Sequence, residues 1–304
     1  MASTTRRNFI KISSTLTASL ALSGPDFYKK KYKPLLSFST LGCPKWTFEQ
    51  ILKCTVENHY DGIELRGILG ELYLPKCSEL NSKENIAATR KRVEDKGKKI
   101  VDLGSSATLH FPEGAERQKN LEEGKRFIDL AHGLNCPNVR VYPNNFPKGQ
   151  DRDKTLDLIS KGLLDLGSYA KNSGVRVLME THGEVLWSDV ILQIMKTAEH
   201  PNVGIVWDIF NMWEKTKESP AMVHEKLKKY IYHVHVKDAK IIDGKNKFVM
   251  LGMGETPLNE AFKALSKSKF KGYYSFEWEK LWHPEIDEPE NVLPVYPKVM
   301  MKYF

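Results

Sequence analysis

The chain has 304 residues, enough for one large domain or two small ones, which excludes a disulfide-stapled mini-protein. Hydrophobic residues make up 41% of the sequence and charged residues 28%, a composition typical of a soluble globular protein rather than a disordered or membrane-embedded one. The formal net charge is +8, which raises the question of nucleic-acid binding.

Part of this charge lies in an N-terminal segment that resembles a twin-arginine export signal. A polar residue precedes the pair Arg6-Arg7, and Phe9 and Lys11 complete the pattern. A short apolar stretch follows, too short for a membrane span, and Ala21-Leu22-Ser23 suits a signal peptidase. Cleavage there removes three positive charges, so the remaining excess is mild and nucleic acid is not an expected partner.

We therefore expect three segments along the chain. Residues 1–23 are predicted to be the signal, residues 24–34 a basic linker, and residues 35–304 a single catalytic domain. The mature protein would then be periplasmic or otherwise exported through the twin-arginine pathway. The alternative is a disordered basic N-terminus with a chance pair of arginines.

The four cysteines have no C-x-x-C spacing and are too few for a disulfide framework in a chain of this length. We expect buried thiols and no cysteine metal cluster, and an exported protein leaves the pairing of two of them open. The cysteines are Cys43, Cys54, Cys77 and Cys136.

From residue 35 onward, short β-branched runs alternate with longer amphipathic stretches. The predicted strands are Leu35 to Thr40, Gly62 to Arg66, Lys99 to Gly104, Asn138 to Tyr142, Val175 to Glu180, Val203 to Asp208, Tyr230 to Val236 and Tyr273 to Trp278. The predicted helices cover 47–59, 83–96, 116–134, 152–173, 188–199, 217–229, 257–268 and about 290–302. Eight strands, each followed by a helix, predict an α/β fold of the (β/α)8 TIM-barrel type, with one domain.

The longest break in the alternation runs from Lys237 to Pro257. Its Asp243-Gly244 pair is a turn signal that predicts a small hairpin or lid above the seventh strand.

Four consecutive predicted strands end in a side chain that can bind a metal: Glu180, Asp208, His235 and Glu277. In a barrel, the residues at the carboxyl ends of the strands form the active site. Three buried carboxylates that converge on one imidazole would repel one another without a cation between them. The pattern therefore predicts one divalent metal ion, with Mn²⁺ preferred and Mg²⁺, Co²⁺ or Zn²⁺ as alternatives.

The motifs Met179-Glu180-Thr-His182-Gly183, Trp207-Asp208 and His233-Val-His235-Val-Lys237-Asp238, together with Glu277, resemble the xylose-isomerase-like TIM barrels. Within them they are similar to the sugar phosphate isomerase/epimerase group of ketose 3-epimerases, inosose dehydratases and hydroxypyruvate isomerase. The resemblance implies that Glu180, Asp208, His235 and Glu277 hold the metal. It also implies that Glu180 and Glu277 are the catalytic acid/base pair, and that His233 is a packing or ligand-supporting residue.

Six further residues are candidates for substrate binding, each with a structural alternative. His182 and Glu184, which follow Glu180, either bind substrate hydroxyls or belong to a solvated loop. Lys237 either neutralises an enediolate oxygen or pairs with Asp238. Glu64 either contacts substrate or forms a structural ion pair with Arg66. The remaining candidates are His110 and Asn211, and Asn211 stands where ketose 3-epimerases carry a histidine.

The expected activity is removal of a proton α to a carbonyl of a carbohydrate, through an enediolate. Export favours a non-phosphorylated sugar or keto-sugar, and no Gly-rich phosphate-binding loop is present in the sequence. The alternative is an inosose dehydratase-like enzyme or a keto-glycoside lyase. An apurinic endonuclease and a non-catalytic periplasmic sugar-binding protein are less favoured hypotheses. The sequence does not determine whether the protein forms a homo-oligomer.

Overall fold

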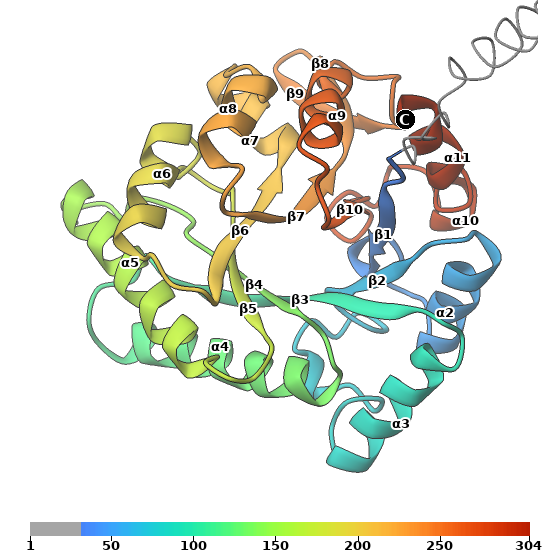
Figure 1. Cartoon of the computed structure of the whole chain (residues 1–304), viewed down its shortest axis with the longest axis horizontal. Coiled ribbons are helices and arrows are strands. Elements are labelled where there is room, and N and C mark those ends of the chain that lie inside the picture. Colours follow the sequence, from blue (N-terminus) through green and yellow to red (C-terminus); the bar gives the residue numbers. More distant parts are fainter. Residues whose placement is uncertain (1–31) are drawn as a thin grey trace, which may run out of the picture. The chain divides into compact units, whose positions relative to one another are not determined.

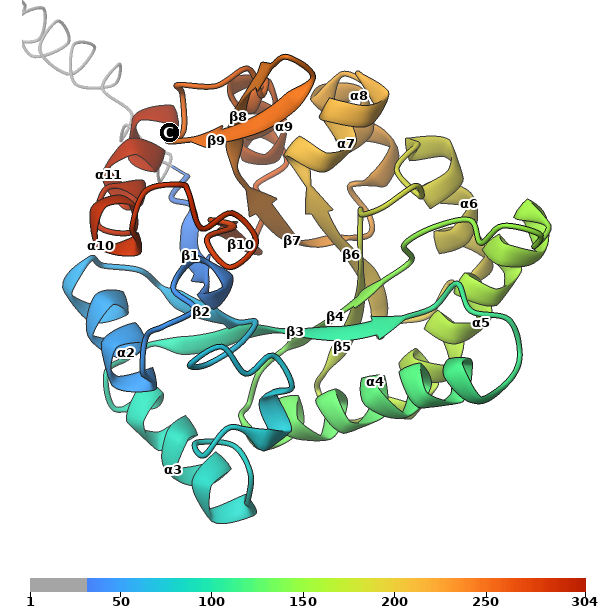
Figure 2. The same ribbon diagram turned by 180° about the vertical axis from the view of Figure 1, so that it is seen from behind.

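The structure, a computed structural model, describes residues 32–304, and residues from Pro34 to Phe304 form one compact unit. Eight parallel strands close into a barrel in the order β1-β10-β7-β6-β5-β4-β3-β2. Helices surround the strands in both views (Figures 1 and 2). The predicted single TIM-barrel domain is confirmed, whereas the predicted signal (1–23) lies outside the described residues.

The barrel strands follow the predicted runs closely. They are β1 (Leu35–Ser39), β2 (Gly62–Leu65), β3 (Lys99–Thr108), β4 (Asn138–Tyr142), β5 (Arg176–Glu180), β6 (Val203–Asp208), β7 (Ile231–Val236) and β10 (Tyr273–Phe276). The α-helices are α2 (Phe48–Glu57), α3 (Lys83–Glu94), α4 (Ala115–Gly133), α5 (Arg152–Tyr169), α6 (Ser188–Thr197), α7 (Ile209–Thr216), α8 (Pro220–Leu227), α9 (Leu258–Lys267), α10 (Pro289–Val292) and α11 (Tyr296–Met300). Among the described residues, no helix is long and apolar enough to cross a membrane.

The strands are buried on both faces, and their two faces differ in chemistry. In β4, Val139 and Val141 flank Arg140, and all three residues are buried. In β7, Val234 and Val236 alternate with His233 and His235 in the same way. Because successive side chains of a strand point to opposite faces, one face of each strand packs against the helices and the other fills the lumen with polar groups. The sequence thus builds a polar interior in the barrel.

The predicted hairpin after the seventh strand is confirmed. Strands β8 (Asp238–Ile242) and β9 (Lys245–Val249) pair antiparallel (Figure 2). The turn residues Asp243 and Gly244 both have positive φ, 50° and 71°, as a two-residue type I′ turn requires. The hairpin is therefore closed by the turn residues that its geometry demands.

The chain after β6 contains one helix more than predicted. The helix predicted over 217–229 corresponds to α8, and the short helix α7 precedes it. Asp208 both ends β6 and caps α7, because its side chain accepts a hydrogen bond from the backbone N–H of Asn211. Lys217 then takes a left-handed conformation that ends α7, and Pro220 begins α8. The predicted last helix is split, into α10 and α11.

All four cysteines are buried and unpaired. Burial raises the pKa of Cys54 to about 11 and that of Cys43 well above its usual value. The expectation of buried thiols is confirmed, and these thiols are kept protonated by their surroundings.

One interior carboxyl of β3, Asp102, has no hydrogen-bond partner on either oxygen although it is fully buried. Burial, and then the negative charge of Glu64 across the β2–β3 register, raise the pKa of Asp102 well above its usual value. The fold therefore binds the proton of Asp102 more tightly than the unfolded chain does. The free energy of unfolding should fall as the pH rises above about 4.

We expect Asp102→Asn to remove this penalty, because an uncharged amide of the same shape replaces the carboxyl. At pH 8 the variant should be more stable than the wild type by about 1–2 kcal/mol, with a smaller difference at pH 5. Urea unfolding at both pH values measures it. A variant that is less stable at pH 8 would mean that the fold uses the ionised carboxylate.

Candidate active site

The four strand-end residues singled out from the sequence converge at the carboxyl end of the barrel. Glu180, Asp208, His235 and Glu277 each offer a ligand atom, and these atoms all lie within 4.8 Å of one another. Asp208 and His235 are direct partners in the β6–β7 register. All four side chains are buried, so the group forms a shielded polar centre.

His235 lies at the middle of this centre. Its Nδ1 is 3.2 Å from Glu277 Oε1 and 3.6 Å from Glu180 Oε1, while its Nε2 is 3.1 Å from Glu64 Oε2. Burial by itself lowers the pKa of His235, but the carboxylates of Glu277, Glu64 and Glu180 outweigh it and hold the pKa well above the usual value. A positive charge is therefore strongly favoured at this position.

Asp208 combines a structural and a site role. Its Oδ1 accepts the N–H of Asn211 at 2.8 Å, and its Oδ2 lies 2.8 Å from Lys237 Nζ. Burial raises the pKa of Asp208 to about 7, with Glu277 and Glu180 adding to the rise and Lys237 opposing it. Asn211 thus contacts the site residue Asp208 through its backbone N–H, and its side chain is half-buried.

The side chain of Lys237 points into the four-residue centre and not toward Asp238, its neighbour in sequence. Its Nζ lies 2.6 Å from Glu277 Oε2 and 2.5 Å from Glu279 Oε1, in addition to its contact with Asp208. The predicted alternative, a pair with Asp238, is wrong, because the Asp238 carboxylate accepts backbone N–H groups of the 252–256 loop. Sequence reasoning missed Glu279, which stands two residues after Glu277.

Arg140 of β4 is a second cation that sequence reasoning missed. Its Nε lies 3.0 Å from Glu180 Oε2, and its Nη1 donates to the Ser105 carbonyl at 2.7 Å. A Cβ on Gly104 would lie 2.7 Å from Arg66 Cδ and 2.9 Å from Arg140 Nη2, so a side chain there would force these arginines to shift. A charged residue between two valines, Val139 and Val141, was the available signal.

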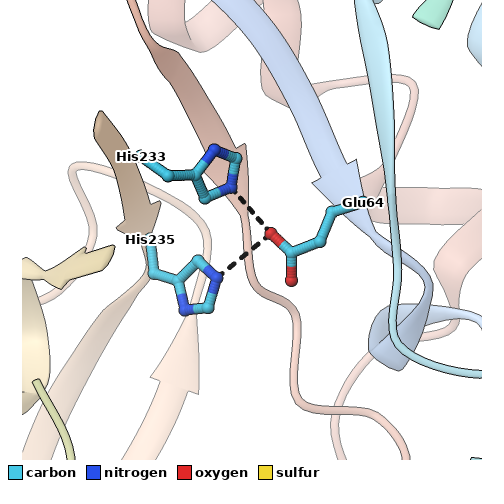
Figure 3. A group of neighbouring side chains, drawn as sticks. All are labelled: Glu64, His233 and His235. Atoms are coloured by element: carbon cyan, nitrogen blue, oxygen red, sulfur yellow. Dashed lines mark hydrogen bonds and ion pairs between the residues drawn. The ribbon is translucent and has the colours of Figure 1, made fainter. Parts of the chain in front are cut away.

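Glu64 and Arg66 do not pair, so that structural alternative is wrong. Figure 3 shows the Glu64 carboxylate facing the two imidazoles of His233 and His235. Arg66 instead donates to Ser106 Oγ at 3.2 Å. Glu64 lies inside the lumen, fully buried, rather than at an open mouth.

The remaining candidates, His110, His182 and Glu184, lie in the loops after β3 and β5. His182 Nδ1 is 2.9 Å from Asn144 Oδ1, the exposed Glu184 accepts the N–H of Phe146 at 2.7 Å, and His110 Nδ1 accepts the N–H of Asn145 at 2.9 Å. Burial lowers the pKa of both His182 and His110. All three side chains contact the 144–146 loop, so they join neighbouring loops at the rim of the site.

The donor set fits one divalent cation. Three carboxylates and one imidazole nitrogen suit an oxygen-preferring ion such as Mn²⁺ or Mg²⁺, and Zn²⁺ accepts the same atoms. Three of the buried ligand atoms have no well-aligned hydrogen-bond partner: His235 Nδ1, Glu180 Oε2 and Asp208 Oδ2. The residues present therefore suit a cation among them.

We expect metal binding to be strongly pH-dependent. Asp208, with a pKa of about 7, and His235, whose pKa is raised, must both lose protons before they bind a cation. The affinity for Mn²⁺ should therefore rise by at least about tenfold from pH 6 to pH 8. Isothermal titration at the two pH values measures the change. Equal affinities would show that neither proton is displaced.

Comparisons with known proteins agree with the barrel fold. A family model described as "Xylose isomerase-like TIM barrel" matches residues 55–293. A search of curated proteins finds no match.

Among solved structures, the probable 3-DHS dehydratase AsbF of Bacillus anthracis, involved in petrobactin synthesis, is 18% identical, with a TM-score of 0.71 over 88% of this chain and 98% of that one. The IOLI protein with a bound zinc atom is 17% identical, with a TM-score of 0.72 over 88% and 97% of the two chains. The 3-keto-D-glucoside 4-epimerase YcjR of E. coli is 13% identical, with a TM-score of 0.68 over 89% and 99%.

At these identities the likeness to solved structures establishes the fold, and the family match covers most of the barrel. The chain belongs to the xylose isomerase-like TIM barrel family.

Proposed function

We propose that the chain is a divalent-metal-dependent isomerase or epimerase that removes a proton α to the carbonyl of a non-phosphorylated sugar or keto-sugar. One observation carries the proposal. Two buried glutamates, Glu180 and Glu277, come from different strands and both face Nδ1 of His235 in the same four-residue group. A site that only binds sugar has no need of two proton-transfer groups around one cation position.

Glu180, Asp208, His235 and Glu277 would hold the metal. When bound, a divalent ion supplies a Lewis acid that polarises a carbonyl and a neighbouring hydroxyl. The two glutamates then act on the C–H bond between these groups, one removing the proton and the other returning one.

Nearby cations lower the pKa of both glutamates, and each glutamate has one cation that the other lacks. Burial raises the pKa of Glu180, but Arg140 and His235 outweigh it and lower the pKa below the usual value. Burial likewise raises the pKa of Glu277, while His235 and Lys237 hold it well below that value. Both side chains are therefore ionised in the free site, each beside its own cation, and the glutamate that returns a proton must first take one up from water.

The return of the proton decides the product. Return to the same carbon from the opposite face gives an epimer, and return to the neighbouring carbon gives an aldose–ketose isomerisation. Loss of a β-hydroxyl instead gives a dehydration, which is the second candidate. It is favoured by the likeness to the probable 3-DHS dehydratase and by Asn211 at the position where ketose 3-epimerases carry a histidine.

The substrate class follows from the proposed place of action. We propose that the Arg6-Arg7 segment exports the protein, which would separate it from the phosphorylated sugars of the cytoplasm. Free sugars, keto-sugars and inososes are then the substrates to test. The sequence pattern supports this step.

Proton exchange tests the proposed function directly. The Mn²⁺-loaded protein is incubated in deuterated water with a panel of free ketoses, keto-glycosides and inososes, and proton NMR is recorded after protein and metal are removed. We expect one C–H signal next to the carbonyl to disappear for at least one compound. Failure to exchange any member of the panel would favour a sugar-binding protein instead.

A further inference from the structure

A hydrogen-bonded group of Glu64, His233 and His235 lies in the lumen next to the four-residue centre. Glu64 Oε2 is 2.9 Å from His233 Nε2 and 3.1 Å from His235 Nε2. Each of the three side chains is at most 1% exposed. Figure 3 shows the single carboxylate oxygen between the two rings.

The contact spans the barrel. In the strand order, β1 and β10 lie between β2, which carries Glu64, and β7, which carries both histidines. No backbone ladder brings these side chains together, so the side chains themselves meet across the lumen. Both histidines contact Oε2 of Glu64, and Oε1 of Glu64 has no hydrogen-bond partner.

The chemistry of this contact fixes where the proton of each ring lies. An ionised carboxylate only accepts hydrogen bonds, so each Nε2 that faces Glu64 Oε2 must carry its hydrogen. Nδ1 is then the only nitrogen of His235 with a lone pair for a cation. That atom faces Glu180 and Glu277, at 3.6 and 3.2 Å.

We propose that Glu64 is a positioning residue that holds His235 in the Nε2–H tautomer and aims its Nδ1 at the metal. His233 donates to the same oxygen from two residues earlier on β7 and so holds the Glu64 carboxylate in place. A hydrogen-bonded carboxylate behind a histidine ligand orients the ring and raises its basicity. The inference rests on the metal site of the proposed function, but not on its reaction.

The same three residues present two imidazole nitrogens and one carboxylate oxygen, which is also a set that can bind a cation. The structure favours hydrogen bonds, because both N–O distances fall in the range of N–H···O bonds. The number of ions bound per chain separates the two arrangements.

Metal binding by Glu64→Gln tests the inference. The amide keeps the shape of the side chain, and its oxygen can still face both rings, but it lacks the negative charge that makes the carboxylate a strong acceptor and raises the basicity of His235. We expect Mn²⁺ affinity, measured by isothermal titration, to fall about 10–100-fold. Asp102→Asn is the matched control, because Asp102 is an equally buried lumen carboxylate that forms no hydrogen bond or ion pair with His235; the affinity of this variant should stay within about twofold of the wild type. An unchanged affinity in Glu64→Gln would overturn the inference.

A second measurement needs no variant and applies even if Glu64→Gln fails to fold. In 15N-histidine-labelled wild-type protein loaded with Zn²⁺, we expect NMR to show His235 protonated at Nε2 and coordinated at Nδ1. Coordination through Nε2, or two ions per chain, would overturn the inference. These readouts do not involve turnover, so a protein that binds metal in this way but exchanges no substrate proton would refute the proposed function alone.

Discussion

Glu180→Gln and Glu277→Gln should each slow turnover by about 10²–10⁴-fold, the usual contribution of a general acid or base. Both side chains belong to the buried centre, and each has its own cation, Arg140 for Glu180 and Lys237 for Glu277. Glutamine keeps the size and one ligand oxygen but cannot take a proton. Turnover is measured at saturating Mn²⁺, with bound metal determined in each sample.

The pattern of exchange separates a role in proton transfer from a role in metal binding alone. If the two glutamates act on opposite faces, each variant keeps one working base. Each should then wash deuterium into only one of the two epimers, without interconverting them, and the two variants should label different epimers. Glu57→Gln, on the exposed face of α2, is the control and should label both epimers as the wild type does.

Two results would contradict this mechanism. If both variants label the same epimer, one glutamate serves both faces and the other only binds. If both variants lose Mn²⁺ and all exchange together, the glutamates are ligands without a separable role as bases.

The ends of the strands were predictable from sequence, because an apolar run that stops at a polar residue is visible in the letters. Val203-Gly-Ile-Val-Trp207 before Asp208 is one such run, and the structure ends β6 at Asp208. The alternation of short β-branched runs with longer amphipathic stretches predicted eight strands and hence the barrel. Local periodicity was sufficient to predict the strand ends and the strand count, because both are determined by residues close together in the sequence.

The partners of the site residues were not predictable in this way. Glu64 meets His233 and His235 across the lumen, at sequence separations of 169 and 171 residues. Arg66 stands two residues from Glu64 on the same strand, yet its side chain bonds to Ser106. In a closed barrel, which interior side chains touch depends on the stagger of distant strands, and no single run of sequence encodes that stagger.

Arg140 was not predicted as a site residue for a different reason. Reading only the last residue of each strand finds ligands at the mouth but passes over charges in mid-strand. Arg140 is fully buried and holds Glu180, so it belongs to the site as much as the residues at the ends. A buried charge needs a partner, and a charged residue inside an apolar run is therefore itself a signal.

Lys237→Met should destabilise the metal-free protein by about 3–5 kcal/mol at neutral pH, the usual cost of removing one partner from a buried ion pair. The ammonium of Lys237 lies against three carboxylates: Asp208, Glu277 and Glu279. Methionine keeps the length of the side chain but leaves those charges uncompensated. Thermal unfolding after chelator treatment measures the loss, and Lys229→Met, which breaks an exposed pair with Glu199, should change stability little.

The pH dependence of this loss follows from the carboxyl groups. Lys237 lowers the pKa of Asp208 and of Glu277, so without it both should bind protons more tightly in the folded chain. Protonation replaces the missing positive charge as the pH falls, so the variant should lose the most stability at pH 8 and little at pH 5. A loss that is the same at both pH values would mean that packing, rather than charge, is what methionine fails to reproduce.

The same variant should bind Mn²⁺ more tightly than the wild type. Lys237 and a bound cation would share Asp208 and Glu277, so the ammonium competes for these oxygens in the metal-free protein. Without the Lys237 ammonium the site is more negative, and the bound metal alone neutralises the two carboxylates. Thermal unfolding with saturating Mn²⁺ should therefore recover most of the stability lost by the metal-free variant. Weaker binding would show instead that Lys237 holds the two carboxylates in the geometry that the metal needs.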